Sequence, residues 1–259
     1  MTALDLFIEN AADVFTSTLQ TATCVGVADG VIVHVGEAPG AEYSIGPQTE
    51  VVNASGMLIM PGLVHCHTHL VFGGDRSDEY ALRAAGADYL EIAAAGGGIA
   101  STMRATRAAS DDALYEAALP RLHRMISHGV TTLEIKSGYG LELESELKML
   151  RVARRLGETQ PVDVVATFLG AHTIPPDRRA HRERHVDEIV MEWLPAVAEQ
   201  GIARFCDVFV EQGAFTLEEA ERVLTAGLEL GLKPKLHVDQ LSAGGGAELA
   251  ARLGATSAD

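Results

Sequence analysis

The chain has 259 residues, enough for one large domain or for one domain with a small appendage. Its hydrophobic fraction of 47% can supply a substantial core, and a composition rich in Ala, Gly, Leu and Val is typical of α/β proteins. The formal net charge of −16 disfavours a nucleic-acid partner, because the phosphates would be repelled.

The ends and the cysteines predict a cytoplasmic protein. Residues 1–6 lack the basic region and the long apolar core of a secretory signal. No apolar run reaches the length of a membrane span, so no membrane partner is expected. The cysteines are few and scattered (Cys24, Cys66 and Cys206), which fits a reducing compartment without a disulfide framework. Cys66 is expected to pack on the face of a strand opposite to its histidine neighbours.

Residues 1–59 predict a small β-rich subdomain. Two apolar runs, Thr23–Val27 and Val31–Val35, flank Ala28-Asp29-Gly30, a pattern typical of a β-hairpin in which Gly supplies the turn. Glu50–Asn53 predicts a further strand. This segment shows no obvious catalytic pattern and is interpreted as an appendage.

Residues 60–259 predict part of a (β/α)8 barrel of the TIM type, because apolar strands alternate with amphipathic helices. The predicted strands are Leu58–His65, Thr131–Ile135, Val162–Leu169, Phe205–Val210 and Lys235–Val238. These give about five strand–helix units where a complete barrel has eight. The last residues resemble the lead into a sixth strand, so the chain is expected to stop within the barrel, without its last strands.

Helices are predicted between these strands. Ser145–Gly157 carries regularly spaced apolar residues, and Thr216–Gly231 opens with the spacing of a capping box. Pro120 is expected to break or kink the segment from Asp111 to His128. In folds of this type the active site lies at the carboxyl ends of the strands.

Three histidines, His65, His67 and His69, stand at alternate positions where the first barrel strand ends. Alternate residues of a strand face the same side, so a pair of these imidazoles could bind a metal ion. Residues four apart on a strand are separated by about 13 Å, so all three cannot hold one ion. The alternative is that they are core histidines that only form hydrogen bonds, which fits a lone histidine better than three.

Other polar residues follow the later strands. His237 lies on the last predicted strand and could complete a metal site, although a lone histidine there is more often a core residue. Arg76, after two glycines, could bind a carboxylate or simply pair with Asp78 or Glu79. Tyr139 lies in a glycine turn, where it could bind substrate or cover apolar surface. His172 could polarise a carbonyl, move a proton or only cap its strand.

Together these stretches resemble the imidazolonepropionase family of the amidohydrolase superfamily. The similarity runs in register from about residue 57 to the end of the chain. It is carried by Pro61–Arg76, Ala94–Ile99, Glu134–Leu141, Thr167–Pro175, Asp207–Glu211 and His237–Leu253. The paired-histidine motif indicates only the superfamily, whereas Glu134–Leu141 and the Gly-Gly-Asp-Arg loop are far more specific.

The resemblance implies a metal-dependent hydrolase with one divalent or trivalent ion, zinc or iron, that activates water. It assigns the metal to His67, His69 and His237. It also implies a further ligand, an aspartate on the last barrel strand, which would lie beyond Asp259. His65 stands where relatives often have an acidic residue, and its role is left open.

The substrate implied by the resemblance is 4-imidazolone-5-propanoate, whose ring amide would be opened to N-formimidoyl-L-glutamate in histidine degradation. The resemblance places Arg76, Tyr139, His172 and Gln240 against the substrate, with His172 and Gln240 in catalytic roles. An amide cannot act as a general base, so Gln240 would orient water or a ring nitrogen. A homodimer is expected only by analogy with relatives.

Two alternatives remain open. Another cyclic-amide hydrolase or a nucleobase deaminase would share the paired histidines, although Arg76 and Tyr139 favour a substrate that bears a carboxylate. The chain could also be a non-catalytic fragment that binds metal weakly, in which case open sheet edges and bare apolar faces would make it poorly soluble.

Overall fold

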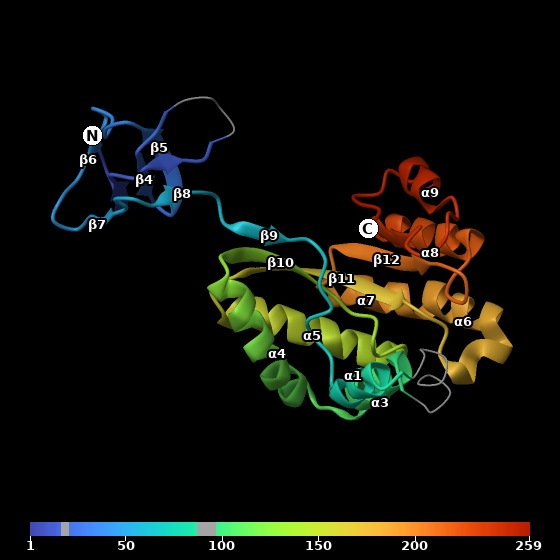
Figure 1. The fold of residues 1–259 in the computed structure, drawn as a ribbon. Coiled ribbons are helices and arrows are strands. Elements are labelled where there is room, and N and C mark those ends of the chain that lie inside the picture. Colours follow the sequence, from blue (N-terminus) through green and yellow to red (C-terminus); the bar gives the residue numbers. More distant parts are fainter. Residues whose placement is uncertain (17–20, 87–96) are drawn as a thin grey trace. The chain divides into compact units, whose positions relative to one another are not determined.

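The fold was analysed in a computed structural model, which describes residues 1–16, 21–86 and 97–259. The chain forms two compact units, Met1–Gly62 and Leu63–Asp259 (Figure 1). The predicted second domain began at residue 60, three residues before the second unit. Part of the Ala94–Ile99 stretch lies outside the described residues.

The first unit consists of short strands in three small sheets. The strands are β1 (Thr2–Ala3), β2 (Leu6–Glu9), β3 (Asp13–Val14), β4 (Cys24–Ala28), β5 (Val31–Gly36), β6 (Tyr43–Ser44), β7 (Glu50–Asn53) and β8 (Leu58–Ile59). Their orders are β5-β4-β2-β7, β1-β6 and β3-β8. The predicted hairpin is β4–β5, and its turn residues Asp29 and Gly30 both have positive φ, 51° and 71°. Two successive residues of this kind match the right-handed twist of the flanking strands.

The second unit is built on a five-stranded parallel sheet in the order β13-β12-β11-β10-β9. Its strands are β9 (Leu63–His65), β10 (Val130–Lys136), β11 (Asp163–Ala171), β12 (Phe205–Val210) and β13 (Lys233–Val238). Beyond β13, Ala258 pairs in parallel with Leu236, so the last residues do begin a sixth strand. The predicted α/β class and partial barrel are therefore confirmed.

The predicted strand Leu58–His65 is wrong as one element. Leu58–Ile59 pair with β3 in the first unit, whereas Leu63–His65 pair with β10 in the second. Pro61 and Gly62 lie between the two pieces. Proline has no backbone N–H to donate to a ladder, so the apolar run is divided there between two sheets.

Helices cover the sheet of the second unit. They are α1 (Ser77–Ala84), α3 (Ile99–Ala108), α4 (Asp111–Ser127), α5 (Leu143–Thr159), α6 (Arg182–Glu188), α7 (Leu194–Gln200), α8 (Leu217–Glu229) and α9 (Gly246–Arg252), with a 3-10 turn at Pro176–His181 and a π turn at Ile189–Trp193. The core is apolar and includes Leu122, Leu133, Leu150 and Phe168, all fully buried. Thr216 forms the predicted capping box at the start of α8.

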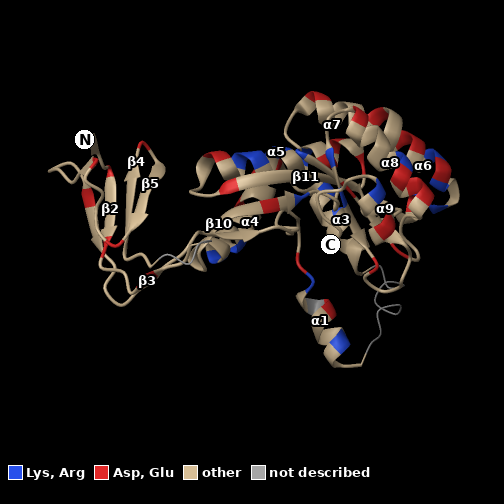
Figure 2. Cartoon of the chain, turned by 90° about the horizontal axis from the view of Figure 1, so that it is seen from above, with Lys and Arg blue, Asp and Glu red and all other residues tan. Residues whose placement is uncertain are grey.

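The predicted break at Pro120 does not occur, because α4 runs through it as one helix. Pro120 lies on the exposed side of α4, where water can satisfy the carbonyl that loses its partner. Charged positions gather on the helices rather than on the strands (Figure 2). Among the described residues, no helix is long and apolar enough to cross a membrane.

A buried histidine outside the sheet predicts acid sensitivity. His185 on α6 packs edge-on against Trp193, and neither ring nitrogen has a hydrogen-bond partner. Burial, with a smaller effect of Arg178, lowers the pKa of His185 to about 4. The unfolded chain would take up this proton near pH 6.5, so folding loses stability as the pH falls from 7 towards 4.

Because of His185, acidification from pH 7 to pH 5 is expected to lower the free energy of unfolding by on the order of 1–2 kcal/mol. His185→Leu should shrink this difference, measured by denaturant unfolding at both pH values. The control is His181→Leu, at an exposed position. An unchanged pH dependence in His185→Leu would contradict the assignment.

Candidate metal centre

Three imidazoles from opposite edges of the sheet meet in the second unit. His67 and His69 follow the end of β9, and His237 lies on β13. A flat five-stranded sheet would hold its edge strands about 19 Å apart. The ring centroids of His67 and His237 are nevertheless only 4.3 Å apart, because the sheet curls as a barrel does.

The three histidines form the kind of donor set that holds a metal ion. One ring nitrogen from each of His67, His69 and His237 lies within 4.8 Å of the others. Nδ1 of His69 and both nitrogens of His237 are buried without a hydrogen-bond partner. Buried polar atoms of this kind are costly unless something binds them. The cluster therefore fits a metal ion, for which imidazole nitrogens are common ligands.

The protonation of these rings also fits metal binding. Burial, reinforced by His172 and His237, lowers the pKa of His69 to about 2. Burial and His237 also lower the pKa of His67, against the opposing effect of Asp259. Both rings are thus neutral at neutral pH, which is the form that binds metals.

Carboxylates stand behind two of the rings. Asp259 Oδ2 lies 3.0 Å from Nδ1 of His67, and Asp207 Oδ2 lies 2.9 Å from Nδ1 of His237. The His67 contact is a hydrogen bond, whereas the His237 contact is a close approach without hydrogen-bond geometry. Carboxylates in this position orient ligating histidines. They leave Nε2 of His67 and of His237 for the ligand side.

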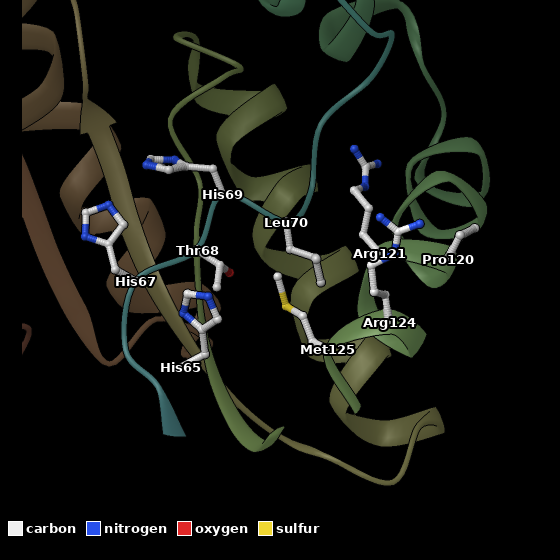
Figure 3. Close-up of a pocket in the computed structure, with 9 residues that line it drawn as sticks. All are labelled: His65, His67, Thr68, His69, Leu70, Pro120, Arg121, Arg124 and Met125. Atoms are coloured by element: carbon white, nitrogen blue, oxygen red, sulfur yellow. The ribbon is translucent and has the colours of Figure 1, made fainter. Parts of the chain in front are cut away.

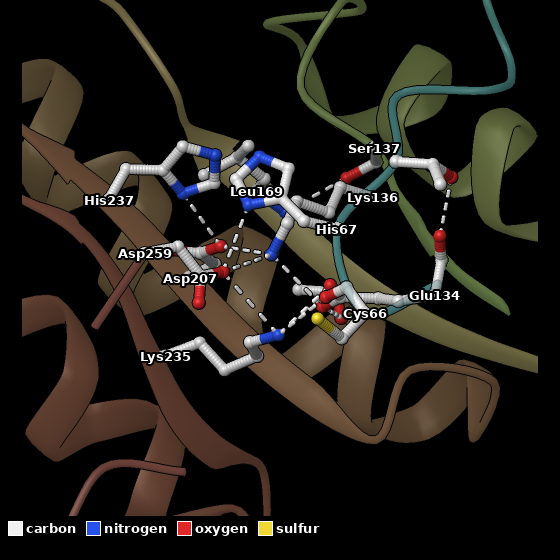
Figure 4. Close-up of polar contacts among 12 residues, drawn as sticks. Cys66, His67, Glu134, Lys136, Ser137, Leu169, Asp207, Lys235, His237 and Asp259 are labelled. Atoms are coloured by element: carbon white, nitrogen blue, oxygen red, sulfur yellow. Dashed lines mark hydrogen bonds and ion pairs between the residues drawn. The ribbon is translucent and has the colours of Figure 1, made fainter. Parts of the chain in front are cut away.

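A buried network of charges supports these carboxylates (Figure 4). Lys136 Nζ is fully buried and lies 3.0 Å from Glu134 Oε1 and 2.7 Å from Asp207 Oδ2. Lys235 Nζ lies 2.9 Å from Glu134 Oε2, and both ammonium groups are 3.6 Å from Asp259 Oδ2. Two lysines therefore bridge three carboxylates directly beneath the histidines.

The charges in this network stabilise one another. Burial raises the pKa of Asp207, but His237 and Lys136 outweigh it and hold that pKa at about 2. Burial alone would lower the pKa of Lys136. The nearby charges of Asp207 and Glu134 outweigh burial, so the pKa of Lys136 is raised. The sequence interpretation missed this network. The available signal was charged residues at alternate positions, Glu134 and Lys136, within a strand expected to be buried.

Tyr139 and His172 lie beside the histidine cluster. The His172 ring is stacked on His69 with centroids 5.0 Å apart, and the Tyr139 ring is 5.4 Å from His69 and 5.3 Å from His172. Burial raises the pKa of Tyr139, and Arg76 opposes this effect. The phenol is therefore protonated at neutral pH and available as a hydrogen-bond donor.

The tautomer of His172 follows from its partner. Nδ1 of His172 lies 2.8 Å from the carbonyl oxygen of Gly138. A carbonyl only accepts, so Nδ1 carries the proton and Nε2 keeps a lone pair. Burial, against the opposing hydrogen bond to Gly138, lowers the pKa of His172 to about 4. Nε2 of this neutral ring can accept a hydrogen bond but has no proton to donate to an oxyanion.

The remaining predicted site residues lie further out. Arg76 precedes α1, is about half exposed and approaches Glu79 at 3.9 Å. The positive charge of Arg76 nevertheless opposes the effect of burial on the pKa of Tyr139. Gln240 is exposed in the loop after β13, and its substrate contact stays a prediction.

A cavity of about 490 Å³ opens between the chain after β9 and helix α4 (Figure 3). It is lined by His65, His67, Thr68, His69, Leu70, Pro120, Arg121, Arg124 and Met125. His65 thus borders the same space as the two predicted ligands, outside the three-histidine cluster. Cys66 is exposed, so its predicted packing role is wrong. β9 is an edge strand that ends at His65, which leaves Cys66 beyond the sheet.

The chain is similar in sequence to known proteins. The chain is 52% identical to the imidazolonepropionase of Myxococcus xanthus, over 100% of this chain and 65% of that protein. It is 54% identical to the imidazolonepropionase of Methylobacterium nodulans, over 91% of this chain and 58% of that protein. The chain thus spans roughly three fifths of the length of these relatives. No protein-family model matches the sequence.

Solved structures support the fold. A crystal structure of 5-methylcytosine deaminase from Klebsiella pneumoniae covers 98% of this chain and 55% of its own, with a TM-score of 0.65 and 14% identity. An adenosine deaminase from Xanthomonas campestris with bound zinc covers 98% of this chain and 56% of its own, with a TM-score of 0.52 and 20% identity. The second unit therefore shares the fold of part of these structures, a parallel sheet that curls as in a barrel. By its sequence, the chain is similar to imidazolonepropionases over 91–100% of its own length.

Proposed function

We propose that the chain carries the metal-binding part of an imidazolonepropionase, which hydrolyses the ring amide of 4-imidazolone-5-propanoate to N-formimidoyl-L-glutamate. The observation that carries this proposal is the cluster of His67, His69 and His237, whose ring nitrogens converge within 4.8 Å. Identities of 52% and 54% to imidazolonepropionases support the choice of reaction.

The metal of this site is zinc or iron in the proposal. His67, His69 and His237 would hold it, and all three offer the imidazole ligands that suit either ion. When bound, the ion supplies Lewis acidity, lowering the pKa of a coordinated water towards about 7. Asp259 and Asp207 keep the rings of His67 and His237 in place from behind.

The chain's own residues would bind the substrate and move its protons. The neutral ring of His172 has a free lone pair on Nε2, which can accept a hydrogen bond from the attacking water or from the ring N–H of the substrate. The protonated phenol of Tyr139 can donate to a substrate oxygen. Gln240 would orient water or a ring nitrogen when substrate is bound. The oligomeric state of this assembly stays a prediction, with a homodimer expected by analogy.

Arg76 would anchor the propanoate through its planar guanidinium. Arg76→Ala is expected to raise KM for 4-imidazolone-5-propanoate about 10- to 100-fold with a smaller effect on kcat, because a hydrogen bond to a charged group contributes about 1.5–3 kcal/mol. Arg83→Ala, at an exposed position on helix α1 that follows Arg76, is the matched control. A KM within twofold of the parent would contradict the anchoring role.

The function is tested by a direct comparison of substrates. The 259-residue chain, loaded with zinc or with iron, is expected to consume 4-imidazolone-5-propanoate and to leave cytosine and guanine unchanged. Turnover of a nucleobase instead would favour a deaminase. Turnover of none of the three would support the non-catalytic alternative.

A further inference from the structure

A fully buried carboxylate, Glu146, lies behind the loop that carries Tyr139. Glu146 is on the first turns of α5 and has no exposed surface. Its Oε2 accepts a hydrogen bond from the backbone N–H of Gly138 at 2.8 Å. Its Oε1 accepts from the N–H groups of Gly140 at 2.8 Å and Leu141 at 2.7 Å. One side chain thus binds three backbone donors of a five-residue turn.

The same turn is held from its other side. Arg107 on α3 donates from Nε to the carbonyl of Gly140 at 2.7 Å and from Nη2 to the carbonyl of Leu141 at 2.8 Å. Leu141 has a left-handed backbone, with φ of 52°, which is unfavourable for a leucine. The turn therefore keeps an unfavourable conformation because its N–H and C=O groups are bound by Glu146 and Arg107.

Residues 137–141 also fix the position of the His172 ring. Gly138 has φ of 104°, and a Cβ built there would lie 3.0 Å from Nδ1 of His172 and 2.9 Å from the carbonyl oxygen of Leu169. Only glycine leaves room for the His172 ring to reach the Gly138 carbonyl at 2.8 Å. Glu146 binds the N–H of the same residue, Gly138, whose carbonyl binds His172.

We propose that Glu146 is a positioning residue, which acts through residues 137–141 to fix the tautomer of His172 and the orientation of Tyr139. Glu146 lies behind the turn, and the backbone of that turn carries its effect to both rings. A catalytic benefit of this positioning rests on the proposed function. The positions of His172 and of the turn can be measured without any turnover of substrate.

The test uses the full chain with histidine labelled in ¹⁵N, and amide hydrogen exchange of the same protein. In the parent, His172 should carry its proton on Nδ1, and the amides of Gly138, Gly140 and Leu141 should be protected. Glu146→Gln replaces one acceptor by an NH₂ group that faces a backbone N–H. We expect these three amides to exchange at least about tenfold faster and the His172 signal to show mixed tautomers.

The matched control is Glu144→Gln, an exposed carboxylate on the same turn of α5 that pairs with Arg151. It should leave exchange and tautomer as in the parent. Arg107→Met is the second variant, in case Glu146→Gln does not fold, and it should also loosen the turn. A proton on Nε2 of His172 in the parent, or unchanged exchange and tautomer in both variants, would overturn the proposal whether or not the chain is active.

Discussion

Replacing His237 by Asn is expected to abolish stoichiometric metal binding. The parent should retain about one zinc or iron ion per chain after dialysis, and His237→Asn less than about a tenth of that. His237 contributes one of the three imidazoles of this cluster, from a strand at the opposite edge of the sheet from the other two. Replacing a residue that only forms a hydrogen bond to a metal ligand lowers metal affinity about 10- to 100-fold. Replacing the ligand itself should therefore lower metal affinity more than about 100-fold.

Metal analysis of the dialysed proteins measures this effect directly. The matched control is His128→Asn, an exposed histidine after the end of α4, which should keep the parent's metal content. Far-ultraviolet circular dichroism of His237→Asn should match the parent, so that metal loss is separated from unfolding. Equal metal content in His237→Asn and the parent would show that the three histidines are not the site.

Replacing Lys136 by Met is expected to lower the free energy of unfolding by about 3–5 kcal/mol. The side chain is fully buried and contacts Glu134 and Asp207 at 3.0 and 2.7 Å. Methionine fills similar space, so the loss comes from two buried carboxylates that keep their charge without this cation. Removing one partner of such a network costs far more than breaking a surface ion pair, which contributes about 0–1 kcal/mol.

Denaturant unfolding of the purified variants checks this prediction. Lys233→Met is the control, because Lys233 lies on β13 but is exposed. The double variant Lys136→Met with Asp207→Asn should recover part of the lost stability, since the carboxylate of Asp207 is then replaced by a neutral amide, whereas Glu134 keeps its contact with Lys235. A loss below about 1 kcal/mol in Lys136→Met would mean that the network is not a source of stability.

Local sequence patterns predicted the features of this chain that depend on neighbours along the chain. Alternation of strands and helices predicted the parallel sheet, and the spacing of His65, His67 and His69 predicted a histidine pair at the end of its first strand. The family resemblance then selected His67 and His69 as that pair. The capping box at Thr216 was likewise readable, because the side chain of Glu219 and the Thr216 hydroxyl satisfy backbone groups three residues away.

Features set by long-range contacts could not be read in this way. The apolar run around Pro61-Gly62 is divided between two sheets. Which sheet each part joins is visible only from its pairing partner, β3 for the first part and β10 for the second. Lys136 meets Asp207 across 71 residues, and His172 meets Gly138 across 34. His237 by itself did not indicate a metal ligand, because a lone histidine on a strand is more often a core residue. Only the family resemblance grouped it with the other two histidines.

X-ray absorption spectroscopy of the zinc-loaded chain tests the metal centre most directly. The proposed ligand set predicts about three imidazole nitrogens at about 2.0–2.1 Å, with the characteristic multiple scattering of histidine rings. Sulfur at about 2.3 Å, which Cys66 next to His67 in the sequence could supply, or a shell of oxygens alone would contradict a centre held by His67, His69 and His237.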